Sequence, residues 1–250
     1  MHDRLFQSEE FGTAGPATAT IIFICPYGTP IEKVQFAIRR LLRGGYHVVA
    51  YQTTAEVFMA ADPGILPELI AGVREDIRSR IDALTAAGVT EFGFFGSSLG
   101  SFILYNCVGD AIPEFRWGVF NTGGNIARGL WTMADLRQAH VARGWSLPGL
   151  EEAWAALQWP AFGDLEGCRF VFSSSRRDGA APLRDIEQYL GPMLRAGADV
   201  RVHEVPAWSH RTTVIAGLVL APKLVRMVTK DRAAGRGHAR MNLASRVRSR

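Results

Sequence analysis

Cysteine is scarce in this sequence. Its 250 residues include only Cys25, Cys107 and Cys168, which are widely spaced, and no Cys-x-x-Cys or Cys/His ligand spacing occurs. An odd number of cysteines, each in or beside an apolar run, is typical of buried free thiols in a reducing compartment. The pattern argues against a disulfide scaffold and against a zinc site, so we expect no metal.

Long apolar runs are also lacking. The longest early run, residues 21–25, is far shorter than the roughly 20 apolar residues that span a bilayer. The first residues, Met1-His2-Asp3-Arg4, do not have the basic start and apolar core of a signal peptide. We therefore expect a cytoplasmic protein without a transmembrane segment.

Positive charge is concentrated near the C-terminus. Residues 226–250 contain eight Lys/Arg and one Asp, a net charge of +7 against +4 for the whole chain, which leaves −3 for residues 1–225. We expect residues 229–250 to form a basic, disordered tail. Such a tail can contact anionic surfaces, but no specific nucleic-acid partner is expected. The oligomeric state stays open, with a homodimer as one alternative.

Apolar residues make up 48% of the chain, enough for a sizeable core. β-Branched and aromatic runs alternate with amphipathic helical patterns, which predicts a mainly parallel, doubly wound α/β sheet with helices on both faces. Six strands are expected, at residues 20–25, 46–51, 92–96, 116–121, 169–173 and 199–205, with a short edge strand near residues 5–6.

The helix boundaries are marked by capping residues, glycines and prolines. For the first helix we expect Thr29 as N-cap, Pro30 at the first helical position and Glu32 closing a capping box. Later helices are expected at 67–87, at 183–196 with an interruption at Pro192, and at 212–228 with a kink at Pro222.

The interval 122–165 is too long for a simple crossover and contains helical patterns near 132–143 and 149–158. We expect it to form a helical cap inserted before the fifth strand, so that residues 1–121 and 166–228 form the core.

Tryptophans are concentrated in this interval, which holds four of the six: Trp131, Trp145, Trp154 and Trp159. They either pack the cap onto the core or line an apolar pocket. As candidate substrate-binding residues we name Trp131 and Trp154 from the cap, and Trp208 beside a candidate catalytic histidine.

The sequence Gly96-Ser97-Ser98-Leu99-Gly100 follows an apolar run and precedes a helix-compatible segment at 99–109. Strand, Gly-x-Ser-x-Gly and helix are the context of a nucleophile elbow. In a chain with 26 glycines such a spacing also arises by chance, and the alternative is a tight turn with an inert serine.

A serine nucleophile needs a base, and the base needs an orienting group. Asp178 follows the fifth strand and His210 follows the sixth, at the end of a parallel sheet where partners of Ser98 are expected. Asp164, which precedes its strand, and Asp185, in the first turn of a helix, are the less suitable acids. The other five histidines lie inside strands, in the cap or near the chain ends.

Acyl transfer also needs donors for the developing oxyanion. The backbone N–H of Leu99 is one candidate, and the loop after the first buried strand supplies the other. Pro26 has no N–H, so we choose Tyr27, with Gly28 next. The alternative is that Tyr27 only packs beneath the cap.

These motifs together resemble the α/β-hydrolase superfamily over residues 20–228. The resemblance implies a triad with Ser98 as nucleophile, His210 as general base and Asp178 as its orienter, and no metal or organic cofactor. Two departures stand out. The loop after the first strand, which often reads His-Gly in this superfamily, is Cys25-Pro26-Tyr27-Gly28 here, and the N-terminal region is short for the usual opening hairpin.

The expected function is hydrolysis of a carboxylic ester with an apolar acyl or alcohol part through an acyl-enzyme. Serine at position 98 argues against the dehalogenase and epoxide hydrolase members, which use aspartate. An acyltransferase or thioesterase on the same triad, and a binding protein of this fold without catalysis, are the alternatives.

Overall fold

The computed structural model describes residues 5–12, 19–54, 62–158, 160 and 162–229. At its centre is a seven-stranded sheet in the order β1-β3-β2-β4-β5-β6-β7. All neighbouring strands are parallel except β1 and β3. The strands are β1 Phe6–Phe11, β2 Ala19–Ile24, β3 Tyr46–Thr53, β4 Phe92–Ser97, β5 Phe115–Asn121, β6 Arg169–Ser174 and β7 Asp199–Glu204. The predicted fold class is confirmed, and the expected edge strand is the antiparallel β1.

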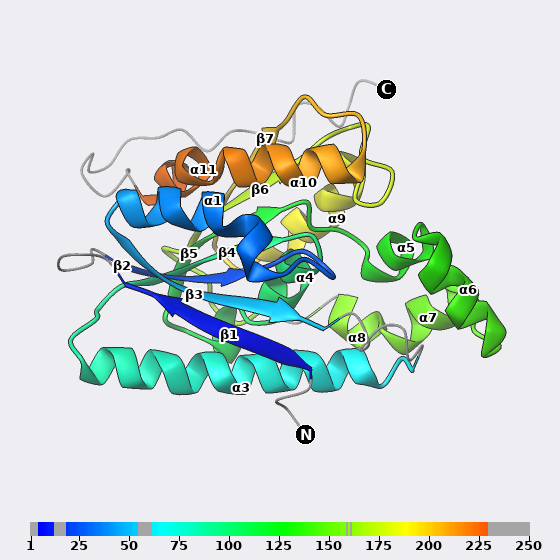
Figure 1. Ribbon diagram of the computed structural model, residues 1–250, viewed down its shortest axis with the longest axis horizontal. Coiled ribbons are helices and arrows are strands. Elements are labelled where there is room, and N and C mark those ends of the chain that lie inside the picture. Colours follow the sequence, from blue (N-terminus) through cyan, green and yellow to red (C-terminus); the bar gives the residue numbers. More distant parts are fainter. Residues whose placement is uncertain (1–4, 13–18, 55–61, 159, 161, 230–250) are drawn as a thin grey trace.

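Helices cover both faces of the sheet because successive strand residues point to opposite sides. Ile22 and Ile24 of β2 belong to the core beneath α3 Ile65–Ala86, α4 Leu99–Tyr105 and α9 Leu183–Arg195. Ile21 and Phe23 belong to the core beneath α1 Ile31–Arg43, α10 His210–Val219 and α11 Ala221–Thr229. Figure 1 shows α1, α10 and α11 on one side of the sheet and α3 on the other.

Four short helices lie between β5 and β6: α5 Ile126–Trp131, α6 Ala134–Ala142, α7 Leu147–Ala153 and α8 Ala155–Gln158. In Figure 1, α5, α6 and α7 lie beyond the end of the sheet toward which β2 and β3 point. The sequence predicted helix in two stretches of this interval but not α5. The division of the chain into a core and a cap stays a prediction.

The expected capping box on the first helix is wrong. Pro30 is the N-cap residue, with ψ 152°, and its own side chain makes no capping hydrogen bond. The first helical N–H, of Ile31, is instead bonded to Oε1 of Gln52 at 2.7 Å. The hydroxyl of Thr29, the predicted N-cap, donates to the carbonyl oxygen of Tyr27 instead. Gln52 from β3 therefore takes the place of the predicted local cap.

The prolines in the two later helices behave differently from one another. Pro192 lies inside α9, which continues through it, so the expected interruption is absent. The expected kink at Pro222 is present as a break between α10 and α11, which are bent by 63°. Within the described residues no single helix is long and apolar enough to cross a membrane, and α10 with α11 meets that test only as this bent pair.

Candidate active site

Ser98 occupies a strained turn between β4 and α4. Its backbone has φ 53° and ψ −116°, a left-handed φ that is uncommon for any residue other than glycine. A Cβ at Gly100 would lie 2.2 Å from the carbonyl oxygen of Ile24, and one at Gly96 would lie 2.6 Å from the carbonyl oxygen of Gly100. The two glycines of the motif are thus required by close backbone contact, and the strain at Ser98 is typical of a functional site.

The Ser98 side chain meets His210. Its Oγ lies 2.8 Å from Nε2 of His210, which is the first residue of α10. The start of this helix is fixed by a capping box between Ser209 and Thr212. This capping box holds the backbone of His210 in place, so that its ring faces Ser98.

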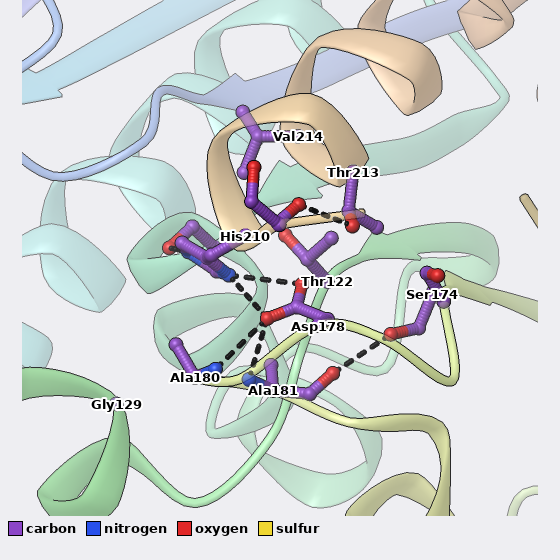
Figure 2. A network of polar contacts seen from close by, with 12 residues as sticks. Thr122, Gly129, Ser174, Asp178, Ala180, Ala181, His210, Thr213 and Val214 are labelled. Atoms are coloured by element: carbon purple, nitrogen blue, oxygen red, sulfur yellow. Dashed lines mark hydrogen bonds and ion pairs between the residues drawn. The ribbon is translucent and has the colours of Figure 1, made fainter. Parts of the chain in front are cut away.

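The other ring nitrogen of His210 meets Asp178. Nδ1 lies 3.0 Å from each carboxylate oxygen of Asp178, as Figure 2 shows. A carboxylate accepts hydrogen bonds, so this contact favours the tautomer with the proton on Nδ1. Nε2 is then left as an acceptor for the hydroxyl of Ser98.

Asp178 is 1% exposed, and its surroundings favour the ionised form. Burial by itself raises the pKa of this carboxyl. The hydrogen bond and charge of His210, together with the backbone N–H groups of Ala181 and Ala180, outweigh burial and lower the pKa below its usual value. Those N–H groups donate to Oδ1 at 2.9 and 3.0 Å (Figure 2).

Two serine hydroxyls, one from the last residue of β6 and one from the residue after it, hold the loop that carries Asp178. Ser174 donates to the carbonyl oxygen of Ala181 at 2.8 Å, and Ser175 donates to that of Ala207 at 2.7 Å. The second bond ties the loop of the acid to the loop that leads into His210. The structure therefore brings together Ser98, Asp178 and His210. Asp164 instead accepts from the N–H of Glu166, and Asp185 lies in the first turn of α9.

A cavity of about 30 Å³ opens beside Ser98. Both expected oxyanion donors, Leu99 and Tyr27, are among its lining residues. Leu99 is the first residue of α4, and the first N–H groups of a helix have no partner within it. Much of the wall is apolar and comes from α4 and α5.

The three tryptophans proposed for substrate binding do not line this cavity. Trp154 is 2% exposed, and its indole N–H donates to the carbonyl oxygen of Pro63 at 2.8 Å. Trp131 is half-buried at the end of α5, and Trp208 is 74% exposed. Trp159 lies outside the described residues. A role of these side chains in binding stays a prediction.

The sequence analysis missed two residues at the end of β5. The carbonyl oxygen of Asn121 accepts from the N–H of Ser98 at 2.8 Å, and its Nδ2 donates to Ser97 Oγ and to the carbonyl oxygen of Val214 in α10. Thr122 has φ 59° and lines the cavity. The available signal was a pair of polar residues at the end of a buried apolar strand that follows the elbow helix in the sequence.

In the described part of the chain, no group of three or more His, Cys, Asp or Glu side chains is arranged to hold a metal ion. The three cysteines are free and buried. Burial raises the pKa of the Cys107 thiol to about 12, with nearby Arg74 and Arg78 opposing the shift, so this thiol is protonated at neutral pH.

No family model matches this chain, and no curated protein matches it in sequence. Solved structures match its fold. An esterase from Pyrococcus furiosus is 14% identical with a TM-score of 0.56, covering 93% of each chain. A lipase in an open form is 15% identical with a TM-score of 0.62, covering 94% of this chain and 97% of its own.

A carboxylesterase from Lactobacillus plantarum is 12% identical with a TM-score of 0.57, covering 93% of this chain and 94% of its own. These are proteins of the α/β-hydrolase superfamily, and this chain has the α/β-hydrolase fold. The predicted resemblance is confirmed at the level of the fold.

Proposed function

We propose that this protein is a serine hydrolase that cleaves carboxylic esters through an acyl-enzyme on Ser98. The observation that carries the proposal is a continuous hydrogen-bonded chain of three side chains. It runs from Ser98 Oγ to His210 Nε2 at 2.8 Å, and from His210 Nδ1 to the buried carboxylate of Asp178 at 3.0 Å. The esterases and lipases among the structural neighbours support the same reaction class.

The geometry supports a two-stage reaction. As Ser98 Oγ attacks the ester carbonyl carbon, His210 Nε2 takes the hydroxyl proton, and the Asp178 carboxylate stabilises the imidazolium. The N–H groups of Leu99 and Tyr27 are the proposed donors to the oxyanion. When the intermediate collapses, the C–O bond to the alcohol breaks, and the alcohol leaves with the proton from Nε2.

Water then repeats these steps on the acyl-enzyme. His210 removes a proton from the water, the resulting hydroxide adds to the acyl carbon, and the bond to Ser98 Oγ breaks. The proton returns to Ser98, the carboxylic acid leaves, and the triad is restored. The largely apolar cavity wall from α4 and α5 favours an ester with an apolar part.

Labelling with a fluorophosphonate tests the activated serine without knowledge of the natural substrate. We expect mass spectrometry to find the adduct on Ser98, and Ser98→Ala and His210→Ala to abolish it. Asp178→Asn should slow ester turnover by about 10⁴-fold, because an amide at this position selects the wrong histidine tautomer.

The matched control is Ser146→Ala, which removes a serine hydroxyl that caps α7 and lies outside the triad. It should label as the wild type does. A folded protein that hydrolyses p-nitrophenyl acetate equally well with and without Ser98 would contradict the proposal.

A further inference from the structure

A second, smaller cavity lies next to the one beside Ser98. Its volume is about 10 Å³, and its lining is largely aromatic: Phe102, Tyr105, Phe120, Phe172 and Tyr189. Phe102 and Gly124 line both cavities, so the ring of Phe102 is the side chain that they share. Phe102 therefore forms a partition between an outer cavity at the nucleophile and an inner aromatic cavity.

The outer cavity is small. A volume of about 10–15 Å³ on the same scale holds one water molecule, so about 30 Å³ accommodates a group of roughly two non-hydrogen atoms. The inner cavity, at about 10 Å³, is too small for a separate ligand. It provides extra room only if the partition is removed.

Phe102 is held firmly in place. It lies one turn along α4 from Ser98, and its N–H donates to the carbonyl oxygen of Ser98 at 3.3 Å. Its own carbonyl oxygen accepts from Nδ2 of Asn106 at 3.0 Å, and the residue is 2% exposed. These bonds fix the backbone of Phe102, and burial restricts the movement of its ring.

The helix that carries the base and the wall that contains Phe102 belong to cores on different faces of the sheet. The leaving alcohol must receive its proton from His210, and α10 packs through Val214 and Leu218 on one face. Phe102, Ile126 and Leu130 belong to the core on the opposite face. The wall that contains Phe102 therefore lies on the side available to the acyl group.

We propose that Phe102 limits the acyl group transferred to Ser98 to a short chain, of acetyl or propionyl size, by closing the outer cavity against the inner aromatic one. This inference rests on the proposed function and names the substrate class of the same site. The substrates are then esters of short carboxylic acids, and the inner cavity is an unused extension of the acyl site.

The test compares p-nitrophenyl acetate, butyrate, hexanoate and octanoate, which share one leaving group. For the wild type we expect kcat/KM to be highest on acetate, to be lower already on butyrate, and to fall by at least about tenfold at octanoate, since an extra methylene in a closed apolar pocket changes kcat/KM by roughly tenfold or more. A series of alkyl acetates, which varies the alcohol, should show a weaker dependence on length. A stronger dependence in the alcohol series would overturn the assignment of this cavity to the acyl group.

Phe102→Ala should join the two cavities. We expect the preferred ester to shift from acetate to hexanoate or octanoate, with the octanoate-to-acetate ratio of kcat/KM rising by at least about tenfold. Phe102→Leu removes less of the ring and should shift the ratio in the same direction by less. It also provides the test if the alanine variant does not fold.

Phe115→Leu is the matched control, because Phe115 is 1% exposed in the same core and lines neither cavity. It should leave the ranking of the esters unchanged while loosening the core. A ranking that does not change in the Phe102 variants, or that changes equally in Phe115→Leu, would overturn the inference. Absence of Ser98-dependent turnover of any ester in the wild type would instead count against the proposed function.

Discussion

His140 in α6 is a buried histidine whose two ring nitrogens have no hydrogen-bond partner among the described residues. It is 2% exposed, and its ring lies edge-on to Trp154, with 6.3 Å between the ring centroids. Burial, and next the charge of Arg143, lower the pKa of His140 below its usual value. The folded protein therefore favours the neutral ring.

A pH dependence of stability follows from this lowered pKa. The unfolded chain binds the proton near the ordinary pKa of about 6.5, whereas the folded protein binds it only at lower pH. The free energy of unfolding should therefore fall as the pH decreases below about 6.5 and through the lower pKa of the folded state. His140→Phe and His140→Gln should both reduce this loss, which thermal unfolding measured between about pH 7.5 and about pH 5 would detect.

The two variants separate charge from packing, because glutamine cannot become positively charged but is as polar as the neutral imidazole. Phenylalanine adds apolar contact with Trp154, so it should also raise the midpoint at neutral pH. An unchanged decrease in the midpoint on acidification in both variants would show that His140 is not the group responsible.

Asn121 shows how a single residue coordinates two parts of the site. Its carbonyl oxygen accepts from the N–H of Ser98 and from the hydroxyl of Ser101, and its Nδ2 donates to the carbonyl oxygen of Val214, one turn after His210 in α10. A Cβ at Gly217 would lie 1.8 Å from Oδ1 of Asn121, so glycine there permits the contact. Asn121 thus helps to position the nucleophile relative to the base, although none of its described hydrogen bonds is made to the side chain of Ser98 or of His210.

At the scale of elements, the elbow depends on the approach of α4 to β2. The Cβ of an alanine at Gly100 would meet backbone atoms of Ile24, which are fixed in the middle of the sheet. Gly100→Ala should therefore displace the turn, lower the thermal midpoint and reduce fluorophosphonate labelling of Ser98 by about 100-fold, as expected for a misplacement of about 1 Å.

Gly179→Ala is the control for this prediction, because nothing lies within 4 Å of its added Cβ and its φ is not in the left-handed region. It lies next to Asp178, so it tests the same site with the same chemical change. We expect labelling within about twofold of the wild type and a slight gain in stability. Equal labelling of the Gly100 and Gly179 variants would mean that the elbow tolerates a side chain at position 100.

Much of the fold could be predicted from short-range patterns. Continuous apolar runs gave the buried strands, and the position of Asp178 and His210 after two of them placed both residues at the sheet end where Ser98 lies. The placement of the three residues at one end of the sheet follows from strand order and direction, which alternation of strand and helix largely determines.

The remaining features depend on contacts between residues far apart in the sequence. The first N–H of α1 is bonded to Gln52, which belongs to β3, and not to the predicted N-capping residue. No local sequence pattern contains that information. α5 is too short for its periodicity to be recognised, although it forms part of the cavity wall. The bond from the Trp154 indole to Pro63 likewise joins segments far apart in the chain, so neighbouring residues could not indicate its burial.

At the scale of the whole molecule, the site combines elements from both faces of one sheet. The nucleophile directly precedes α4, which packs with α3 and α9, and the base is the first residue of α10, which packs with α1 and α11. Two cores that share a sheet hold the two groups, so their 2.8 Å separation depends on the integrity of both. None of these elements extends beyond Thr229.

Positive charge is concentrated in the C-terminal segment. Residues 230–250 lie outside the described residues and contain seven Lys/Arg and one Asp, so their removal changes the net charge of the chain from +4 to −2. A chain ending at Thr229 should keep kcat/KM on p-nitrophenyl acetate within about twofold and should lose salt-sensitive retention on heparin, because clustered cations bind polyanions by releasing counterions. A variant in which all seven basic residues are replaced by glutamine separates charge from length and should behave as the truncated chain does. Loss of ester turnover in either variant would show that the site requires the tail, and unchanged retention on heparin would place the anion-binding charges on residues 1–229.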